Sequence, residues 1–589
     1  MKIIIDSNTQ KNIDHWLDGH YDFETKEEIR RLQRENPEEL IDAFYTTLTF
    51  GTGGLRGIMG PGTNRMNIYT IRTTTQGLSN YINAQISNQE TPTVIIGYDS
   101  RHHASKFAQE AANVLAANGI EVFIYEALRP VALVSFGVLY KKMTAGIMIT
   151  ASHNPPNYNG YKVYWGDGGQ VLPPHDRNII EAIQQISSDE MVKTVRYPHP
   201  LIHKVNGEID RAYLETIHKQ QLYSKDNKNH GQTLHVVYTS LHGAGITILP
   251  LALCDWGFTH LTIVEEQATP NGDFSTVTSP NPEDPAALAM GVEKLKKVKG
   301  DLLIGTDPDT DRIGVAMIHE NAPFFFDGHQ LACLLLNHIC YGLQKMNKMP
   351  SQPMFIKTIV TTELFRKIAE YYGGECLDVL TGFKYIGQKI AQWEEEKSPY
   401  HYIFGGEESY GYLFGSHVRD KDAIISAACI CEAALQLKKK GETLVDSLYQ
   451  IYQTHGIFRE KLLSLSFEGK PGAKRIKAIM QNLRNSPLKL ANIPVIAIED
   501  YLSQTKTNLD TGQKEALTLP KSNILRFWLI DGSKIVVRPS GTESKIKIYA
   551  AVEDKNPKGD GEIEKAINRC DAHLNKMLLL IENQLSSLS

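Results

Sequence analysis

A short apolar run that stops abruptly is the feature that most constrains the fold of this chain. Ala145–Ile149 has the uniform apolar character of a buried strand, and it leads directly into the loop TASHNPP at residues 150–156. Because proline cannot donate a backbone hydrogen bond, the chain must leave a sheet here. In open α/β sheets ligands bind at the carboxyl ends of strands, so Ser152 stands where a nucleophile could reach a substrate. The alternative is a turn serine that bonds only to nearby backbone.

Two familiar serine mechanisms do not fit the residues around Ser152. The hydrolase elbow G-x-S-x-G would need glycine at the positions of Thr150 and Asn154. His153 follows directly, and adjacent side chains of an extended segment point to opposite faces, which argues against His153 as the base for Ser152. These exclusions favour phosphoryl transfer, because an acidic loop and phosphate-sized loops follow later in the chain.

Strand and helix patterns alternate over most of the sequence, which predicts α/β domains. The expected strands of these domains are residues 93–97, 121–125, 234–238, 261–264, 301–304, 354–360, 375–379 and 401–404. Residues 12–48 predict two amphipathic helices in an N-terminal extension, and the polar residues 220–232 predict a linker or surface loop. The last part differs, because strands at 524–530, 534–537 and 545–549 precede a helix at 562–581.

The glycine-rich loop FGTGGLRG at residues 50–57 offers close backbone approach to a ligand. It is not a dinucleotide fingerprint, because G-x-G-x-x-G counted from Gly51 would need glycine at Arg56. Arg56 could instead offer forked donors to a phosphate. Further on, Asn159 and Gly160 predict a tight hairpin turn, and Lys162 would open the returning strand near Ser152. Lys162 is then a candidate phosphate ligand or acid/base, with a solvated lysine as the alternative.

The loop GTDPDTDR at residues 305–312 is the strongest local signal. Asp307, Asp309 and Asp311 are spaced at i, i+2 and i+4, and Pro308 prevents a regular ladder, so the three carboxylates could converge on one hard cation. Three carboxylates leave room for a phosphate oxygen, which is how magnesium sits in many phosphoryl-transfer sites. A solvated acidic turn is the alternative.

An EF-hand calcium loop also begins with alternating acids, but it does not fit. Counted from Asp307, its sixth position requires glycine and is Arg312, and its twelfth requires glutamate and is Ile318.

Later loops offer groups for a polar substrate. TGFK at residues 381–384, and Glu407 with Ser409 in GGEESYG, place carboxylate and hydroxyl groups near strand ends, where they suit sugar hydroxyls; helix capping is the alternative. RPSGTE at residues 538–543 combines hydroxyl and amide donors with one arginine, which suits a phosphate; a plain turn is the alternative.

Size and charge narrow the function classes. The 589 residues predict three to five domains. No apolar run is long enough for a membrane span, and the apolar start is interrupted at Asp6, so we expect a cytoplasmic protein without a secretory signal or a membrane partner. A net charge of −5 argues against a nucleic-acid partner. The seven cysteines lack metal-type spacing and predict buried thiols, without disulfides or zinc.

Four motifs together resemble the α-D-phosphohexomutase family of phosphoglucomutases and phosphomannomutases. TASHNPPNYNGYK resembles its phosphoserine loop, GTDPDTDR its magnesium loop, GGEESYG its sugar-binding loop and RPSGTES its phosphate-binding loop, in the family's order over nearly the whole chain. The length and GTGGLRGIMGPGTNRMN are similar to the subgroup with bacterial phosphoglucomutases and phosphopentomutase-like enzymes. Ser544 departs from the proline usual in the family, which removes no ligand.

The resemblance implies an α/β fold with four domains around a central cleft. Three similar α/β domains with mixed sheets would precede a smaller α+β domain. The expected boundaries are 1–210, with the N-terminal extension and phosphoserine loop, 211–325 with the metal loop, 326–455 with the sugar loop, and 456–589 with the phosphate loop.

The resemblance also implies a mechanism. Phosphorylated Ser152 would pass its phosphoryl group to a sugar monophosphate, and the resulting glucose 1,6-bisphosphate, which is also the activator, would reorient and return the other phosphoryl group. One Mg²⁺ per chain would be held by Ser152, Asp307, Asp309 and Asp311, with Lys162 as acid/base and Arg56 at the reaction centre. The expected substrate contacts are Arg312, Thr381, Gly382, Lys384, Glu407, Ser409, Arg538, Ser540, Gly541 and Thr542.

The implied reaction is the interconversion of glucose 1-phosphate and glucose 6-phosphate. Phosphomannomutase, phosphopentomutase and sugar-bisphosphate synthase activities are alternatives, and a non-catalytic sugar-phosphate-binding protein is a further one. Small sugar phosphates are the expected partners, and the chain would be a monomer or a dimer. A local basic field that includes Arg56, Arg101 and Lys162 would attract dianionic sugars to an acidic protein.

Overall fold

The computed structural model describes residues 5–51, 54–86, 91–205, 207–467, 469–490, 493–540, 545–555 and 562–587. The chain forms two compact units. The first contains Met1–Phe326, Ile386–Ile403 and Ser409–Leu435, and the second contains Asp327–Tyr385, Phe404–Glu408 and Gln436–Ser589. The four domain boundaries expected from the sequence stay a prediction.

Short helices open the first unit. They are α1 (Ser7–Asp18), α2 (Phe23–Glu35) and α3 (Pro37–Phe44). The expectation of two helices was wrong, because Pro37 cannot continue α2 and instead starts α3. Asn36 caps the new helix by accepting the Glu39 N–H at 3.3 Å. Trp16 packs edge-on against Tyr69, with ring centroids 5.5 Å apart, which attaches these helices to the following domain.

A mixed sheet with the order β1-β5-β4-β2-β3-β6 follows. Its strands are β1 (Gly54–Ile58), β2 (Thr93–Tyr98), β3 (Glu121–Tyr125), β4 (Ala145–Ile149), β5 (Tyr158–Trp165) and β6 (Ile202–Val205). The accompanying helices are α4 (Ile68–Gln85), α5 (Ala104–Ala117), α6 (Val131–Lys141) and α7 (His175–Gln184). The strand predicted before Ser152 is confirmed, and it lies inside the sheet.

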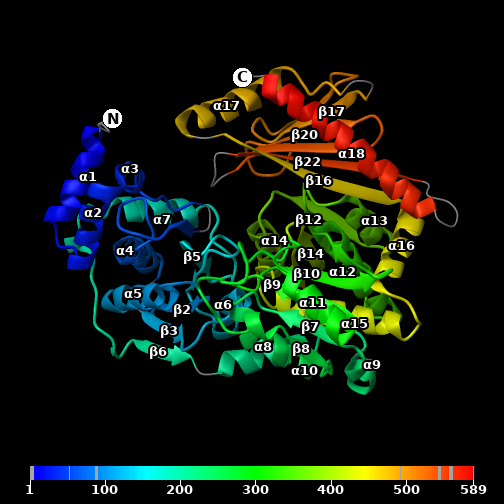
Figure 1. Ribbon diagram of the computed structural model, residues 1–589, viewed down its shortest axis with the longest axis horizontal. Helices are drawn as coiled ribbons and strands as arrows, with labels where there is room; N and C mark the ends of the chain where they lie inside the picture. The colour runs from blue at the N-terminus through cyan, green and yellow to red at the C-terminus, as the bar shows by residue number, and fades with distance from the viewer. Residues whose placement is uncertain are drawn as a thin grey trace. The chain divides into compact units, whose positions relative to one another are not determined.

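Helices cover both faces of this sheet, and Figure 1 shows β2 and β3 between α5 and α6. Val94 and Ile96 join one apolar cluster with residues of α5. Ile95 points to the other face, where a Cβ at Gly137 of α6 would lie 2.5 Å from its Cδ1. Glycine at 137 therefore lets α6 approach the sheet closely.

The hairpin predicted at Asn159 and Gly160 was wrong. Both residues lie inside β5, where Gly160 is paired with Arg56 of β1. A Cβ at Gly160 would lie 2.5 Å from the Thr150 carbonyl oxygen, so glycine serves the close approach of neighbouring strands instead of a turn. The chain reverses earlier, in the loop that contains Ser152.

A second mixed sheet in this unit has the order β11-β10-β9-β7-β8. Its strands are β7 (Val236–Thr239), β8 (Leu261–Ile263), β9 (Leu302–Thr306), β10 (Ile313–His319) and β11 (Ala322–Phe326). The helices around it are α8 (Glu208–His218), α9 (Ser224–His230), α10 (Leu249–Asp255) and α11 (Ala289–Val298).

The linker or surface loop predicted near residues 220–232 was also wrong, because the helix α9 forms within this segment. Asn227 of α9 is buried and donates to Glu432 Oε1 at 2.7 Å, so this polar segment is held by an internal carboxylate. A polar composition does not show whether its groups face water or a buried partner.

The third α/β region contains helices α12 (Gly328–Lys345), α13 (Glu363–Tyr371), α14 (Lys384–Glu395), α15 (Ala423–Lys438) and α16 (Leu444–His455). Its strands are β12 (Pro353–Thr358), β13 (Glu375–Val379), β14 (His401–Glu407) and β15 (Gly411–Phe414). In the second unit, β12 and β13 pair in parallel, with Met354 opposite Glu375.

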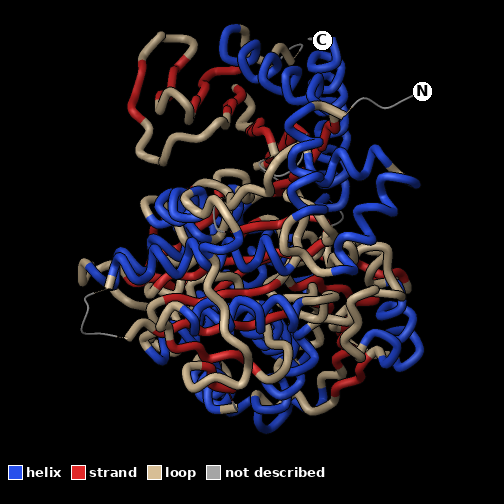
Figure 2. Tube along the Cα trace, turned by 90° about the vertical axis from the view of Figure 1, so that its left-hand side faces the viewer, coloured by secondary structure: helices blue, strands red, loops and turns tan. Residues whose placement is uncertain are grey.

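The C-terminal region of the second unit is an antiparallel sheet with the order β16-β22-β21-β20-β17-β18-β19. Its strands are β16 (Ile457–Ser466), β17 (Val495–Asp500), β18 (Thr505–Asn508), β19 (Lys514–Ala516), β20 (Leu525–Leu529), β21 (Lys534–Pro539) and β22 (Lys545–Asp554). Helices α17 (Gly469–Asn485) and α18 (Glu562–Ser587) accompany it. The long α18 packs on β16 and β22, and Figure 2 shows helices beside red strands near the carboxyl terminus. This confirms a β-rich last region with its own helices.

In the described part of the chain, no helix combines the length and the apolar character that a membrane crossing requires. The seven cysteines are free thiols, but Cys254 is exposed and Cys376 only partly buried, so the expectation of buried thiols was wrong for Cys254.

Candidate active site

Ser152 lies in a tight loop directly after the buried strand β4. Its backbone N–H donates to Thr150 Oγ1 at 2.8 Å, and the Thr150 hydroxyl donates to Asp99 Oδ2 at 2.7 Å. Ser152 has a φ of 52°, in the left-handed region that residues other than glycine rarely adopt. Such a conformation persists only where surrounding contacts determine it, and it is typical of functional sites.

Arg101 supplies many of those contacts. Its buried side chain donates to the carbonyl oxygens of Ser152 and Asn154, to that of Pro155 at 2.8 Å and to that of Tyr158 at 3.0 Å. One guanidinium therefore binds backbone along the whole loop. The sequence predicted only that Arg101 would add to a basic field, whereas its donors are used to shape the nucleophile loop.

Asp99 completes this support. Burial raises the pKa of its carboxyl group to about 6, while Arg101, whose Nε lies 3.4 Å from Asp99 Oδ2, and the Thr150 hydroxyl oppose that rise. Asp99 thus links Arg101 to Thr150 and, through Thr150, to the Ser152 backbone.

The expectation that His153 points away from Ser152 was wrong. His153 Nδ1 lies 3.2 Å from Ser152 Oγ. The reason is the left-handed backbone at Ser152, because the rule of opposite faces holds only for an extended segment. Burial lowers the pKa of His153 well below its usual value, and the nearby Arg312 and Arg56 lower it further.

Asp307, Asp309 and Asp311 follow β9 and are buried together. One carboxylate oxygen of each lies within 4.8 Å of the other two. Asp307 Oδ2 accepts the Ser152 hydroxyl at 2.8 Å, and its Oδ1 accepts the backbone N–H groups of Asp311 at 3.1 Å and Arg312 at 3.0 Å. The acidic cluster and the serine, predicted from separate motifs, therefore form one site.

This cluster fits a hard divalent cation. Asp309 Oδ1 and Asp311 Oδ1 are buried and have no hydrogen-bond partner among the described residues. Burial raises the pKa of Asp307 well above its usual value, and the charges of Asp309 and Asp311 raise it further. Oxygen ligands with unused lone pairs and mutual repulsion are what a cation such as Mg²⁺ would relieve.

Two lysines adjoin the carboxylates. Lys162 Nζ donates to Asp309 Oδ2 at 2.8 Å and lies 3.5 Å from Asp311 Oδ2. Lys421 Nζ lies 3.1 Å from both Asp311 Oδ2 and Asp420 Oδ1. Burial alone would lower the pKa of Lys162, but Asp309 and Asp311 outweigh it and the pKa is raised. Burial opposes ionisation of Asp311, yet Lys421 and Lys162 hold its pKa below the usual range.

The two predicted arginines lie near the Ser152 loop and the three-aspartate loop. Arg56 belongs to β1, and Arg312 directly follows Asp311. Arg56 donates to Asn154 Oδ1 at 2.9 Å, and Arg312 forms an ion pair with Glu283. Burial lowers the pKa of Arg56, although Asp309 opposes the effect.

Ser409, predicted to meet the sugar, also belongs to the first unit. The carbonyl oxygen of its neighbour Tyr410 accepts the N–H of Ile313 at 3.0 Å.

The remaining predicted residues belong to the second unit. Glu407 ends β14 and accepts the Gly382 N–H at 2.8 Å, which joins the two predicted sugar loops, while Thr381 and Lys384 are partly buried beside them. Arg538, near the end of β21, donates to the Tyr549 hydroxyl at 3.2 Å, and the Ser540 N–H donates to the Lys545 carbonyl at 2.8 Å. Gly541 and Thr542 lie outside the described residues.

Family models identify the chain. The model "Phosphoglucomutase/phosphomannomutase, alpha/beta/alpha domain I" matches residues 47–190. The corresponding models for domain II and domain III match residues 211–320 and 327–452. The chain belongs to the phosphoglucomutase/phosphomannomutase family. Within it, residues of the Ser152 loop lie in domain I, and those of the three-aspartate loop lie in domain II.

Individual relatives agree with this membership. A phosphoglucomutase of Staphylococcus epidermidis is 38% identical over 88% of this chain and 93% of its own length. One of Staphylococcus aureus is 40% identical over 89% of this chain and 93% of its own. The solved structure of the Paramecium phosphoglucomutase parafusin covers 92% of this chain and 96% of its own, with a TM-score of 0.65 at 17% identity, which shows a shared fold. This family member is an intramolecular phosphotransferase of the isomerase class.

Sequence reasoning missed Lys421 and Asp420 of this mutase. They belong to the run RDKD at residues 419–422, which directly precedes the apolar helix α15. The available signal was that these charged residues directly adjoin a strongly apolar helix. Charged side chains that are buried with such a helix are rarely without a partner, so the run could have been singled out for buried ion pairs. The spacing alone could not show that Lys421 reaches Asp311.

Proposed function

We propose that this enzyme interconverts glucose 1-phosphate and glucose 6-phosphate, with Ser152 as the phosphoryl carrier. The observation that carries the proposal is the 2.8 Å hydrogen bond from Ser152 Oγ to Asp307 Oδ2. It places a hydroxyl nucleophile directly against a carboxylate cluster fitted for a cation. In a large acidic protein, this pairing favours phosphoryl transfer over acyl transfer.

The proposed reaction has two phosphoryl transfers. In the first, the bond between phosphorus and Ser152 Oγ breaks while a free hydroxyl oxygen of the sugar monophosphate bonds to phosphorus. The sugar hydroxyl loses its proton and Ser152 Oγ gains one, and glucose 1,6-bisphosphate results. After this intermediate turns around, its other phosphoryl group returns to Ser152 by the reverse bond changes, so no phosphate is gained or lost.

Residues of the first unit have proposed roles in these steps. Lys162, whose ammonium is held by Asp309 at 2.8 Å, would move the proton at the transfer centre. Arg56 and Arg312 would orient the phosphoryl oxygens through their forked donors. Asp307, Asp309 and Asp311, with an oxygen on Ser152, would hold one Mg²⁺. When bound, that cation supplies charge neutralisation at the phosphoryl group.

The loops of the second unit would bind the rest of the substrate. Glu407 and the loop at residues 381–384 would bind sugar hydroxyls together with Ser409. Arg538, Ser540, Gly541 and Thr542 would hold the phosphate that is not reacting. The two described arrangements that support this are the Glu407 bond to Gly382 and the position of Arg538 near the end of β21.

Glucose as the substrate rests on the names of relatives 38–40% identical to this chain. The test compares kcat/KM for glucose 1-phosphate, mannose 1-phosphate and ribose 1-phosphate, each with Mg²⁺ and its matching bisphosphate activator. We expect glucose 1-phosphate to be used best. A higher value for mannose or ribose 1-phosphate would reassign the enzyme to a phosphomannomutase or a phosphopentomutase, and accumulation of free bisphosphate would indicate a synthase. Cytoplasmic location and a monomeric or dimeric state stay predictions.

A further inference from the structure

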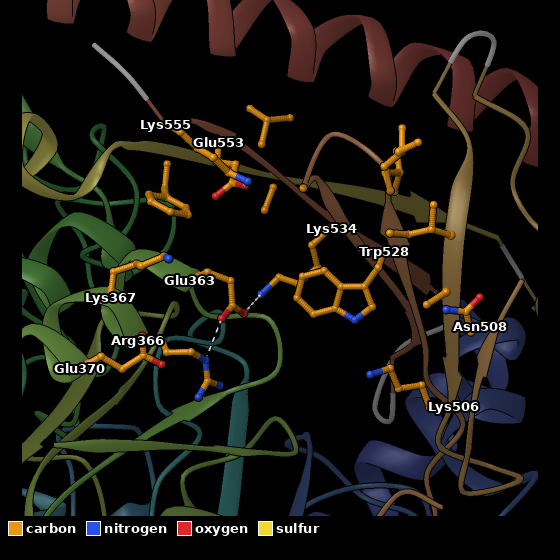
Figure 3. A pocket seen from close by; sticks show the side chains of 18 residues that line it. Glu363, Arg366, Lys367, Glu370, Lys506, Asn508, Trp528, Lys534, Glu553 and Lys555 are labelled. Atoms are coloured by element: carbon orange, nitrogen blue, oxygen red, sulfur yellow. Dashed lines mark hydrogen bonds and ion pairs between the residues drawn. The ribbon is translucent and has the colours of Figure 1, made fainter. Parts of the chain in front are cut away.

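Buried contacts hold one element against another in both units, and a cleft of the second unit illustrates them. It has a volume of about 680 Å³ and lies between α13 and the C-terminal sheet, where Figure 3 shows the side chains that line it. Lys534 of β21 and Arg366 of α13 both bind Glu363. In the first unit, the Ser152 loop and the three-aspartate loop follow strands of different sheets, so contacts outside these loops can decide how they meet.

One segment of the first unit, residues 269–279, contacts the support of the Ser152 loop. The ring of Phe274 is fully buried, and the guanidinium carbon of Arg101 lies over it, 5.0 Å from the ring centroid. A Cβ at Gly272 would lie 2.6 Å from the backbone nitrogen of His102, so glycine permits this close approach. The segment is therefore packed directly against Arg101 and its neighbour.

The contact between Phe274 and Arg101 adds to the other interactions of the guanidinium. Arg101 uses its N–H groups for carbonyl oxygens along the Ser152 loop. The face of an aromatic ring attracts a guanidinium without using those donors, and the attraction is stronger where water is excluded. Ser279 adds a direct contact, because its hydroxyl donates to the carbonyl oxygen of His153 at 2.9 Å.

The same segment also contacts His242, which belongs to the loop after β7. The Thr269 carbonyl oxygen can only accept, so His242 Nδ1 donates to it at 3.0 Å, while Nε2 lies 2.9 Å from Thr276 Oγ1. The Asn271 N–H donates to the His242 carbonyl oxygen at 3.2 Å. His242 is buried, and residues 269–279 supply partners for both its side chain and its backbone.

The loop that contains His242, residues 240–245, lies against the three-aspartate loop. The Ala244 N–H donates to the carbonyl oxygen of Pro308 at 2.8 Å, in the middle of that loop. A Cβ at Gly243 would lie 2.5 Å from Pro308 Cα, so the two backbones are in direct contact. Residues 269–279 thus reach the aspartates through one intermediate loop, as they reach Ser152 through Arg101.

The backbone is strained along this path. Leu241, His242 and Phe274 have φ values of 44°, 62° and 46°, in the left-handed region that bulky residues rarely adopt. Ser152 has a φ of 52° in the same region. Such conformations persist only where surrounding contacts determine them, and they concentrate at functional sites. The strain therefore gives a second indication that this path serves the reaction centre.

We propose that residues 269–279 bridge the two loops of the reaction centre, and that Phe274 and His242 are positioning residues for phosphoryl transfer. Phe274 acts through Arg101 on the position of Ser152, and His242 acts through residues 240–245 on the three aspartates. This inference rests on the proposed function, because it takes Ser152 as the phosphoryl carrier and the aspartates as cation ligands. Because one segment serves both loops, a change at either end affects both.

Phe274→Leu tests the end of the bridge at Arg101. Leucine keeps an apolar side chain but removes the ring face, so we expect kcat to fall by about ten- to a hundredfold while KM for glucose 1-phosphate stays within about twofold. Phe258→Leu, at another fully buried phenylalanine of the first unit, is the matched control and should keep the parent's kcat. In an Arg101→Gln background, Phe274→Leu should lower kcat by less than about twofold further, because the ring acts through the guanidinium.

His242→Ala tests the end at the aspartates. The variant leaves the Thr269 carbonyl and the Thr276 hydroxyl without this partner. We expect the dissociation constant of Mg²⁺, measured by calorimetry, to rise by about ten- to a hundredfold, as it does when outer partners of metal ligands are lost. Phe274→Leu should raise the same constant, whereas Phe258→Leu should leave it within about twofold.

A milder variant gives the answer if Phe274→Leu does not fold. Ser279→Ala removes one hydrogen bond to the His153 carbonyl oxygen, and we expect kcat to fall by about two- to tenfold with a weaker affinity for Mg²⁺. Ser275→Ala, at an exposed serine of the same segment, should match the parent in both measurements.

The outcomes separate a bridge from ordinary packing. Parent-like kcat in folded Phe274→Leu, or an equal fall in Phe258→Leu, would assign Phe274 to core packing and overturn the proposal. A change in only one of kcat and Mg²⁺ affinity would also overturn it, because two independent supports would then explain the data. Failure of the proposed function would instead be seen in the parent, as absence of mutase activity or of phosphate on Ser152.

Discussion

Two buried charge clusters, one in each compact unit, differ in how completely their charges are paired. In the first unit, Asp309 Oδ1 and Asp311 Oδ1 are buried without a hydrogen-bond partner among the described residues. In the second unit, Glu363 accepts from Lys534 at 2.8 Å and Lys357 at 3.0 Å, and Asp378 pairs with Lys357 at 3.0 Å and Arg526 at 2.8 Å. The first cluster still has acceptor capacity to offer, whereas the carboxylates of the second are used by their own cations.

The comparison shows why buried charge alone does not identify a reaction centre. Desolvation penalises both clusters, and each persists only with compensation. In the second unit, protein cations supply it and connect α13 to the C-terminal sheet. In the first, Lys162 and Lys421 compensate only partly, and a loop strained at Ser152 stands beside the remaining oxygens. Buried carboxylates that keep unpaired oxygens next to a nucleophile indicate a reaction centre, whereas carboxylates paired with cations of the protein indicate a structural role.

The largest effect should come from Ser152→Ala. Without the hydroxyl that carries the phosphoryl group, we expect mutase activity to fall by about 10⁴-fold or more. Intact-mass analysis of the active parent should show one phosphate that the variant lacks. Ser188→Ala, an exposed serine of the same unit, should match the parent in both measurements. Normal turnover by Ser152→Ala would remove the covalent mechanism.

Glu363→Gln tests whether the second cluster is a support. Its loss leaves Lys534 and Lys357 buried with less compensation, so we expect the free energy of unfolding to fall by about 3–5 kcal/mol in urea titrations. Glu370→Gln, on the exposed face of the same helix, should change it by less than about 0.5 kcal/mol. If the two variants were equally stable, the pairing in this cluster would not contribute to stability.

Asp309→Asn tests whether the first cluster binds a cation. We expect kcat to fall by about 10²–10³-fold, because a charged ligand next to the reacting group is lost. Chelation should stop the parent reversibly, and titration with Mg²⁺ should restore it at a lower concentration than it restores the variant. Full activity of Asp309→Asn after chelation would make this loop a structural turn.

Arg101→Lys tests the support of the nucleophile loop. Lysine cannot reach all four carbonyl oxygens that the guanidinium binds, so Ser152 should lose its fixed position. Small displacements of a reacting group cost about 10²-fold, and we expect kcat to fall by that factor while KM changes little. Arg72→Lys, which only loses a partly exposed pair with Glu110, is the control. A raised KM with normal kcat would assign Arg101 to substrate binding.

The smallest effect concerns pH and the second cluster. Asp378 is only partly exposed, and its burial alone would raise the pKa of its carboxyl group, but Lys357 and Arg526 lower that pKa from 3.8 to about 2. A depressed pKa stabilises the folded state above pH 4, and this contribution is lost as pH falls toward 2. Between pH 6 and pH 3, urea titrations should show the parent losing about 1 kcal/mol more than Asp378→Asn. Equal losses would mean that Lys357 and Arg526 do not lower the pKa of Asp378 in the folded protein.

The sequence predicted most strands of the fold but not every connection. Runs such as Ala145–Ile149 are recognisable because a buried strand is apolar on both faces. The errors arose where residue types that are common in turns and loops occur inside a strand or a helix instead. Asn159 and Gly160 are typical of a turn, but the glycine was needed for close strand packing. The polar segment at residues 220–232 contains α9, whose buried Asn227 binds Glu432, a partner about 200 positions away that no local pattern could indicate.

The sequence by itself determined which groups could do chemistry. Ser152 after a buried strand, and three aspartates at alternate positions around Pro308, are local patterns whose meaning depends only on covalent geometry and side-chain chemistry. The tertiary structure alone decided that these groups meet. Ser152 and Asp307 are 155 positions apart, and Lys162 and Asp309 are 147 apart, so their contacts depend on how two sheets pack. The same packing places Arg101 where it binds the backbone of the Ser152 loop, and it brings Lys421 to Asp311. The sequence could not show these roles, because the energy of a buried charge depends on its neighbours in space.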